Sequence, residues 1–120
     1  MTNLKKIEKL IEEYVETQPT IQGNKNSLKK LTTNEGLYLF ITKSRNNKDE
    51  VVYVGESINL KGRVNINHSV FKYLIDKNIN FNIRTYTVKN KTISTKLLES
   101  LVLNHLYYEL NFYPMLNKEI

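Results

Sequence analysis

Two short apolar runs, separated by a hydrophilic segment, are the feature that most constrains how this chain folds. Residues 36–41 read GLYLFI and residues 50–54 read EVVYV, with TKSRNNKD between them. β-Branched, aliphatic and aromatic residues dominate both runs, which predicts two strands. The segment between them contains adjacent asparagines and is longer than a tight two-residue turn. The sequence therefore predicts a β-hairpin from residue 36 to residue 54.

Four segments outside this hairpin have the pattern of helices. They are expected over residues 3–16, 58–67, 69–77 and 92–110, where apolar residues recur at helical spacing. Ser57 is the expected cap of the second helix, and Thr92 or Ser94 that of the last.

One further strand is expected over residues 79–86. There Ile79, Phe81, Ile83 and Thr85 alternate with polar residues, as in a strand with one buried face. Residues 17–34 are polar and turn-rich and predict a connector with a short turn near 27–31.

The order of these elements predicts an α/β fold: a small sandwich with a three-stranded, mostly antiparallel sheet flanked by helices. Residues 1–34 would supply an N-terminal helix and a connector, and residues 35–120 the main domain.

Composition narrows the class of protein. The 120 residues are 40% hydrophobic, enough for one core, and no run approaches the 18 apolar residues of a membrane span. The charged N-terminus lacks the apolar region of a signal peptide. The chain has no Cys, which excludes disulfides and Cys-based metal sites and is consistent with the cytoplasm. Its net charge of +6 fits a polyanionic partner, and equally a solvated basic surface.

Most standard catalytic motifs are absent from the sequence. The two histidines, His68 and His105, have no metal-ligand spacing, and neither GxGxxG nor GxxxxGK occurs. No paired catalytic carboxylates stand out, and a cysteine nucleophile is excluded. A zinc enzyme and a phosphate-loop protein are therefore not expected.

Five short motifs occur in a distinctive order, and each alone carries little information. They are Gly36-Leu37-Tyr38, Tyr53-Val54-Gly55, Asn59-Leu60-Lys61-Gly62-Arg63, Leu97-Leu98-Glu99 and Pro114-Met115-Leu116-Asn117. In this order they resemble the GIY-YIG nuclease family over residues 36–117, as a stand-alone endonuclease domain. Leu37 and Val54 replace the isoleucines of the family's two tripeptides. The chain also departs from the family by an insertion between Glu99 and Pro114, and by the acidic Glu56 directly after the second tripeptide.

The resemblance implies a metal-dependent endonuclease that hydrolyses DNA phosphodiester bonds. Tyr53 would be the general base or relay for the attacking water, and Tyr38 would hydrogen-bond the water or the phosphate. Arg63 would hold the phosphate through its planar fork. Glu99 would hold a single Mg²⁺ or Mn²⁺, an ion that needs few protein ligands because it keeps several waters.

The resemblance implies supporting roles for five further residues. His68 would assist proton transfer, and Asn117 would anchor the site or contact the backbone. Gly55 would let the backbone approach the substrate, and Lys61 and Lys72 would bind it. Each residue also has a plain structural alternative: core packing for the tyrosines, a strand-ending turn for Gly55, and solvent exposure for the charged residues.

DNA is the expected partner, and no membrane is expected. The N-terminal helix is too short to select a target by itself, so specificity would come from an accessory specificity protein, a second copy of the chain or a structured substrate. Two other classes stay open at this point: a nucleic-acid-binding module of the same fold without turnover, and a structural domain without a nucleic-acid partner. Restriction, mobile-element homing, phage attack on host DNA and repair are all compatible with the sequence.

Overall fold

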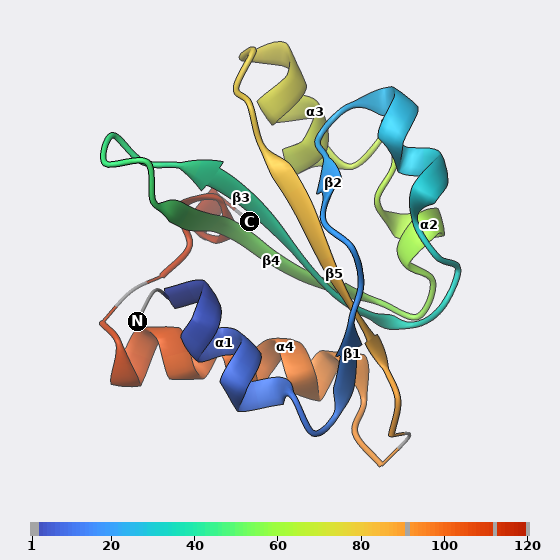
Figure 1. The fold of residues 1–120 in the computed structure, drawn as a ribbon, viewed down its shortest axis with the longest axis vertical. Helices are drawn as coiled ribbons and strands as arrows, with labels where there is room; N and C mark the ends of the chain where they lie inside the picture. The colour runs from blue at the N-terminus through green and yellow to red at the C-terminus, as the bar shows by residue number, and fades with distance from the viewer. Residues whose placement is uncertain (1–2, 91, 112, 120) are drawn as a thin grey trace.

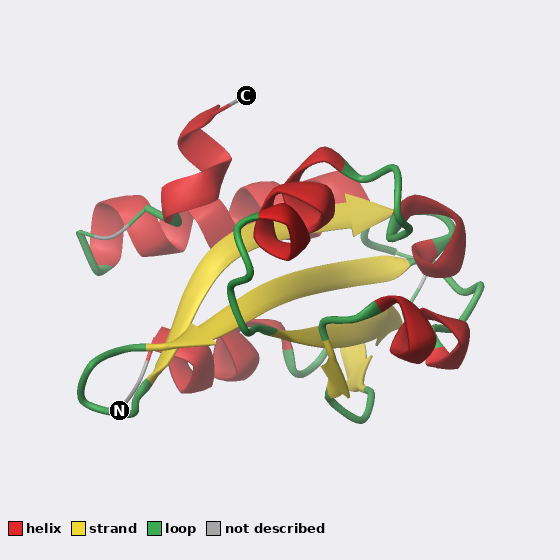
Figure 2. Ribbon diagram, turned by 90° about the horizontal axis from the view of Figure 1, so that it is seen from above, coloured by secondary structure: helices red, strands yellow, loops and turns green. Residues whose placement is uncertain are grey.

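An antiparallel sheet runs through the middle of the molecule, with helices on both faces (Figures 1 and 2). The computed structural model describes residues 3–90, 92–111 and 113–119. Over these residues the sheet has five strands, in the order β1-β5-β3-β4, and β2 also pairs with β5. The strands are β1 (Val15–Thr17), β2 (Ile21–Gln22), β3 (Gly36–Lys43), β4 (Asp49–Ser57) and β5 (Asn82–Val88).

Short helices connect and cover these strands. Their bounds are α1 Asn3–Ile11, η1 Lys25–Lys30, α2 Leu60–Arg63, α3 Ser69–Asp76, α4 Thr95–Asn104, η2 His105–Glu109 and η3 Met115–Glu119. In Figure 1, α1 and α4 lie below the sheet, and α2, α3 and η1 lie above it. Within the described ranges, no helix is both long enough and apolar enough to cross a membrane.

Both faces of β3 are buried, which explains why this strand has no polar residue between Gly36 and Ile41. Leu37 and Leu39 pack in the core layer with α1 and α4. Tyr38 and Phe40 point to the opposite layer, toward Phe71 of α3. Successive side chains of a strand alternate between the faces of a sheet, so a strand covered on both sides must be apolar throughout.

A β-bulge in β4 changes this alternation beside Tyr53. Phe40 pairs with Tyr53 and Ile41 pairs with Val51, so Val52 is the extra residue. Val52 and Tyr53 therefore both belong to the core layer with α2 and α3, whereas Val51 and Val54 belong to the layer with α1 and α4. Bulges re-aim side chains in this way.

The prediction of a three-stranded sheet was wrong, because residues 15–22 add two short strands. The first helix ends at Ile11 rather than at residue 16, and Val15–Thr17 pairs with Tyr86–Val88 of β5. Consecutive acidic residues, Glu12 and Glu13, stand where the helix would continue, and acidic groups are unfavourable at a helix C-terminus. The 3₁₀-helix η1 lies close to the predicted turn at 27–31.

Two local predictions on the site side of the sheet were also wrong. Ser57 ends β4 and does not cap α2; the side chain of Asn59 accepts the capping hydrogen bond, from the Gly62 N–H. Ile79 is 38% exposed and precedes β5. Its N–H donates to the Leu74 carbonyl while Asn78 adopts a positive φ of 58°, so Ile79 belongs to the C-terminal cap of α3.

A polar contact ties α1 to the centre of the sheet. The buried Tyr86 hydroxyl donates to Glu8 Oε2 at 2.6 Å, and Arg84 Nε lies 2.7 Å from the same oxygen as an ion pair. Together with the strands β1 and β2, this contact makes residues 3–34 part of the same sheet and core. The division of the chain after residue 34 stays a prediction.

We expect Tyr86→Phe to lower the free energy of unfolding by about 2 kcal/mol, because it removes a hydrogen bond to a charged group and leaves a half-buried carboxylate. Urea denaturation would measure the loss. Tyr73→Phe, at a site with 45% exposure, is the matched control and should have almost no effect. Equal stability of the Tyr86→Phe variant and the wild-type protein would contradict this account of how α1 is held.

Candidate functional site

Two tyrosines from neighbouring strands meet on the α2–α3 side of the sheet. Tyr38 of β3 pairs with Gly55, and Tyr53 of β4 pairs with Phe40. Their ring centroids lie 6.0 Å apart. Tyr38 is fully buried, whereas Tyr53 keeps 6% of its surface exposed. The hairpin register therefore brings both predicted tyrosines together and leaves only Tyr53 partly accessible.

Gly55 makes room for the Tyr38 ring. A Cβ atom at position 55 would collide with Cζ and the hydroxyl oxygen of Tyr38. This explains the glycine without any reference to a ligand, since the phenol lies directly over its backbone. The predicted contact of Gly55 with substrate stays a prediction.

His68 connects the phenols to the start of α3. Its Nδ1 accepts hydrogen bonds from the N–H groups of Val70 and Phe71, at 3.2 and 3.3 Å, and so caps the helix. Its Nε2 lies 2.7 Å from the Tyr38 hydroxyl. Because Nδ1 is an acceptor, the ring proton must be on Nε2 and is donated to the Tyr38 oxygen. Burial first, and the charge of Arg63 second, lower the pKa of His68 to about 4, so the ring is neutral at physiological pH.

The hydrogen bonds of Tyr38 point toward Tyr53. Burial raises the pKa of both phenols, and most strongly that of Tyr38. A hydrogen bond between them raises the pKa of Tyr38 and lowers that of Tyr53, as expected if Tyr38 is the donor. The proton donors therefore run from His68 Nε2 to the Tyr38 oxygen, and from the Tyr38 hydroxyl to Tyr53. Burial still raises the pKa of Tyr53 above the ordinary value of a phenol, but by less than that of Tyr38.

Arg63, at the end of α2, carries a positive charge that affects the pKa of the two tyrosines, His68 and Glu99. Its guanidinium lowers the pKa of Tyr38, Tyr53 and Glu99 below the values that burial alone would give, and it disfavours protonation of His68. The residue itself is exposed. Arg63 is thus close to four groups from four segments of the chain and is open to solvent.

Glu99 completes the cluster from the other side of the sheet. Helix α4 packs through Leu98 and Val102 on the face opposite to Tyr53. Its Glu99 is nonetheless half-buried, and its charge raises the pKa of both phenols although α4 packs on the other face of the sheet. Burial, followed by repulsion from Glu56, raises the pKa of Glu99, and Arg63 opposes this shift.

Thr95, which the sequence did not indicate as a site residue, holds Glu56 beside Glu99. The Thr95 hydroxyl donates to Glu56 Oε2 at 2.6 Å and thereby joins the start of α4 to the end of β4. The acidic Glu56 was already noticed in the sequence, but no local pattern marks Thr95, since its partner lies 39 positions away.

Asn117 supports the outer edge of β4. Its Oδ1 accepts from the Val54 N–H at 2.8 Å, and its Nδ2 donates to the Val54 carbonyl at 2.9 Å. The carboxamide therefore pairs with the edge strand as another strand would, directly beside Tyr53. This contact fits the anchoring role predicted for Asn117.

The two predicted substrate lysines lie outside the cluster. Lys61 on α2 and Lys72 on α3 are exposed, and Lys61 Nζ lies 3.4 Å from the Lys29 carbonyl oxygen. Neither contributes to the pKa shifts of the tyrosines, His68 or Glu99. Their role in binding substrate stays a prediction.

A cation would suit the acidic part of the site. Glu56 and Glu99 offer the carboxylate oxygens that Mg²⁺ and Mn²⁺ prefer, and a cation between them would offset the repulsion that raises the pKa of Glu99. In the part of the chain that the structure describes, no three His, Cys, Asp or Glu side chains gather into a larger metal-binding group.

Comparisons of the chain with family models, curated proteins and solved structures gave no match in any of the three. The function of the cluster must therefore follow from its geometry and charges.

We expect Gly55→Ala to destabilise the protein by roughly 1–3 kcal/mol, because the added methyl group must displace the Tyr38 ring. Chemical denaturation would measure the cost. Combining it with Tyr38→Leu, which removes the colliding atoms, should make the alanine substitution much less costly. If the cost of Gly55→Ala is unchanged in the Tyr38→Leu background, the contact is not the reason for the glycine.

Folding stability should depend on pH through His68. The pKa of His68 falls from 6.5 to about 4 on folding, so the unfolded chain binds a proton first as the medium is acidified. The stabilisation is complete above pH 6.5 and is lost between pH 6.5 and about 4, at roughly 1 kcal/mol per pH unit.

Urea denaturation across this range, compared with His68→Asn, would test this prediction. Asparagine keeps the capping ability but does not titrate. The difference in unfolding free energy between the two proteins should shrink as the pH falls from 6.5 to 4. A constant difference would refute the assignment of a neutral, helix-capping His68.

Proposed function

We propose that the protein is a divalent-metal-dependent endonuclease that hydrolyses DNA phosphodiester bonds. The observation that carries this proposal is the clustering of the Tyr38, Tyr53 and His68 rings, whose centroids lie 6.0, 5.6 and 5.5 Å apart, where the charge of Arg63 also affects the pKa of each ring and of Glu99. These groups come from β3, β4, the start of α3 and α4. Phosphodiester hydrolysis needs a base for water, positive charge on the phosphate and help for the leaving oxygen.

Tyr53 is the better candidate for the general base. It receives the Tyr38 hydrogen bond and the influence of Arg63, both of which lower its pKa against the effect of burial. Tyr38 donates that hydrogen bond and is fully buried, so it cannot meet a water directly. Tyr38 and His68 would therefore orient Tyr53 and stabilise its phenolate.

Arg63 would bind the scissile phosphate. Its exposed guanidinium is always charged, and its planar fork matches two phosphate oxygens. Because the same group lowers the pKa of Tyr53, binding and base activation would occur at one place. The net charge of +6 would add affinity that is independent of sequence and weakens with salt.

Glu99, with Glu56 beside it, would hold the Mg²⁺ or Mn²⁺. When bound, such an ion supplies Lewis-acid stabilisation of charge on phosphate oxygens. Thr95 would keep the Glu56 carboxylate in place through its 2.6 Å hydrogen bond. The alternative, a nucleic-acid-binding module without turnover, would keep the Arg63 contact but would not need this carboxylate pair.

We expect the purified protein to nick supercoiled plasmid DNA in the presence of Mg²⁺ or Mn²⁺, with little activity in EDTA. Tyr53→Phe, Arg63→Gln and Glu99→Gln should each reduce the rate on the order of 100-fold or more, because each removes a group that acts on the reacting phosphate or water. Gel quantification of nicked and linear products measures the rate.

The matched control for Glu99→Gln is Glu109→Gln, which removes an exposed carboxylate near the C-terminal side of the same helical region. It should leave the rate unchanged. DNA binding by the wild-type protein without any cleavage would instead favour the non-catalytic module. No salt-dependent DNA binding at all would reject both.

A further inference from the structure

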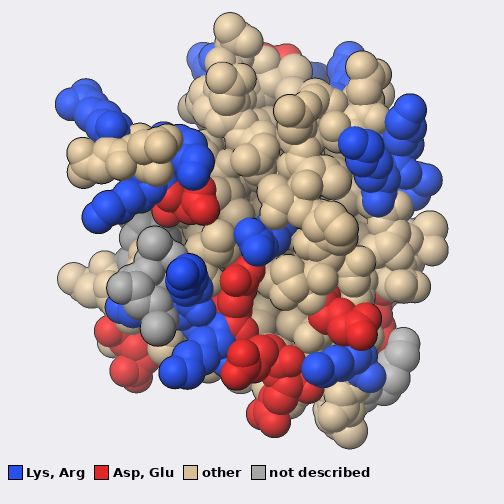
Figure 3. Space-filling model, viewed as in Figure 1, with Lys and Arg blue, Asp and Glu red and all other residues tan. Residues whose placement is uncertain are grey.

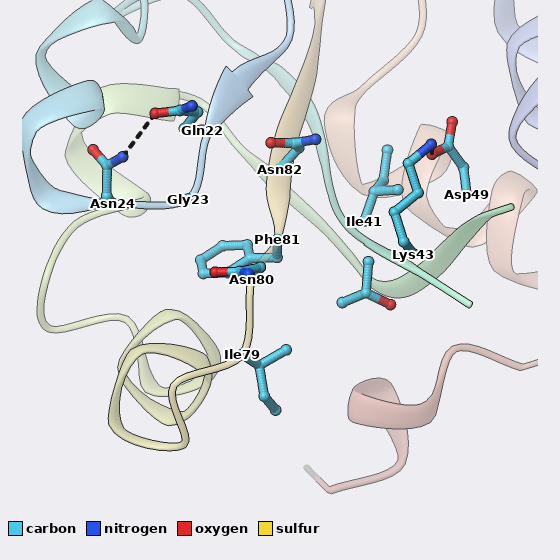
Figure 4. A pocket seen from close by; sticks show the side chains of 11 residues that line it. Gln22, Gly23, Asn24, Ile41, Lys43, Asp49, Ile79, Asn80, Phe81 and Asn82 are labelled. Atoms are coloured by element: carbon cyan, nitrogen blue, oxygen red, sulfur yellow. Dashed lines mark hydrogen bonds and ion pairs between the residues drawn. The ribbon is translucent and has the colours of Figure 1, made fainter. Parts of the chain in front are cut away.

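A groove with a volume of about 760 Å³ lies away from the candidate active site. It is formed by the C-terminal part of β3, the start of β5 and the segment that links β2 to η1 (Figure 4). None of the tyrosines, Arg63, His68 or Glu99 lines it. Thr42 in its wall is four residues beyond Tyr38 on β3, which is about 13 Å along a strand.

Carboxamide groups line much of this groove. Gln22 and Asn24 stand on one side and hydrogen-bond to each other at 3.2 Å, and Asn80 and Asn82 project from the chain at the centre (Figure 4). Asn80 and Asn82 are exposed, and within the described residues their side chains make no hydrogen bond. A carboxamide offers a donor and an acceptor side by side, which is the pattern needed to pair with the edge of a nucleobase.

Apolar side chains also line the groove. Ile79 is 38% exposed, and Phe81 and Ile41 are buried beneath the surface. Asp49 also lines the groove, but its carboxylate is paired with Lys43 at 2.7 Å. The surface thus combines apolar side chains, which can contact a flat ring, with exposed hydrogen-bonding groups.

Basic segments flank the groove on both sides. Figure 3 shows Lys and Arg gathered over the β3–β4 hairpin and, across a largely uncharged surface, over η1 and α2. Arg45 and Lys48 belong to the hairpin, and Lys25, Lys29 and Lys30 belong to η1; all five are exposed. Two basic segments can bind the phosphates of one nucleic-acid strand, and the amide-lined hollow between them can then receive its bases.

The concave shape favours an unpaired strand. In a duplex the base edges lie inside grooves and are read by protruding helices or strands, whereas a base enters a hollow in the protein only when it is unstacked. We propose that this groove binds the bases of an unpaired nucleic-acid segment, with its phosphates on the flanking lysines and arginine. The inference extends the proposed nuclease function by naming a strand with an unpaired region as the substrate.

The test uses binding in the absence of cleavage, so that it does not depend on catalysis. Fluorescence anisotropy with the Glu99→Gln protein in EDTA would compare a labelled 12-nucleotide mixed-sequence DNA, its RNA equivalent and the DNA duplex. We expect the single strands to bind more tightly than the duplex. Asn80→Asp combined with Asn82→Asp places two negative charges in the groove and should weaken single-strand binding roughly tenfold or more.

The control carries the same charge change outside the groove. Asn104→Asp combined with Asn111→Asp alters two exposed asparagines, one at the C-terminal end of α4 and one just after η2, and should change single-strand binding less than twofold. Circular dichroism would verify that both double variants fold. Both double variants would also be made in the protein that has Glu99. They should hydrolyse a small phosphodiester such as bis-p-nitrophenyl phosphate at the same rate, because this substrate is too small to reach the groove.

The two proposals fail in different ways. Equal weakening by both double variants, no weakening by the groove variant, or tighter binding of the duplex would overturn the groove proposal even if plasmid is cut. Loss of single-strand binding in the groove variant alone would support it even if no cleavage is found. Binding of only DNA or only RNA would support the groove and identify which sugar it accepts.

Discussion

The pairing of Tyr38 with Gly55 across the β3–β4 hairpin is the contact on which the candidate site depends. The Tyr38 ring lies over the glycine, where any Cβ would collide with it, and its hydroxyl thereby stays between His68 and Tyr53. A shift of one residue in this register would turn the side chains of one strand over relative to the other, and the two tyrosines would then lie on opposite faces of the sheet. Tyr53 lies two residues before Gly55 in regular register and so shares the face of Tyr38, and the bulge at Val52 begins only beyond Tyr53.

His68 sets the direction of the hydrogen bonds because its two ring nitrogens have different partners, the start of α3 and the Tyr38 hydroxyl. A ring nitrogen that caps α3 cannot carry a proton, so the other nitrogen must donate to Tyr38. Burial and Arg63 keep the ring neutral, so the orientation persists over the physiological pH range. A helix start thus determines which of two phenols is the donor, and Tyr53 becomes the acceptor in front of Arg63.

The sequence predicted those features that depend on local pattern. The hairpin, the long helix α4 with Ser94 as its cap and the burial of Leu60 and Val64 follow from periodicity and capping residues. The strands β1 and β2 could not be predicted from local pattern, because each has only two or three residues and is defined by its pairing with β5. The hydrogen bonds of His68 to Tyr38 and of Thr95 to Glu56 were also missed, since both join residues brought together only by the fold.

An edge strand is a good place for groups from both faces of a sheet to meet. In the interior of a sheet, the neighbouring strands separate the two layers of side chains, so Glu99 on α4 could not act on Tyr53. At β4 no further strand intervenes, and the carboxylate raises the pKa of both phenols although its helix packs on the opposite face. An open edge also exposes unpaired backbone groups, a liability that proteins usually cover. Asn117 pairs with both main-chain groups of Val54, so this edge is closed next to Tyr53 while the side chain of Tyr53 stays partly accessible.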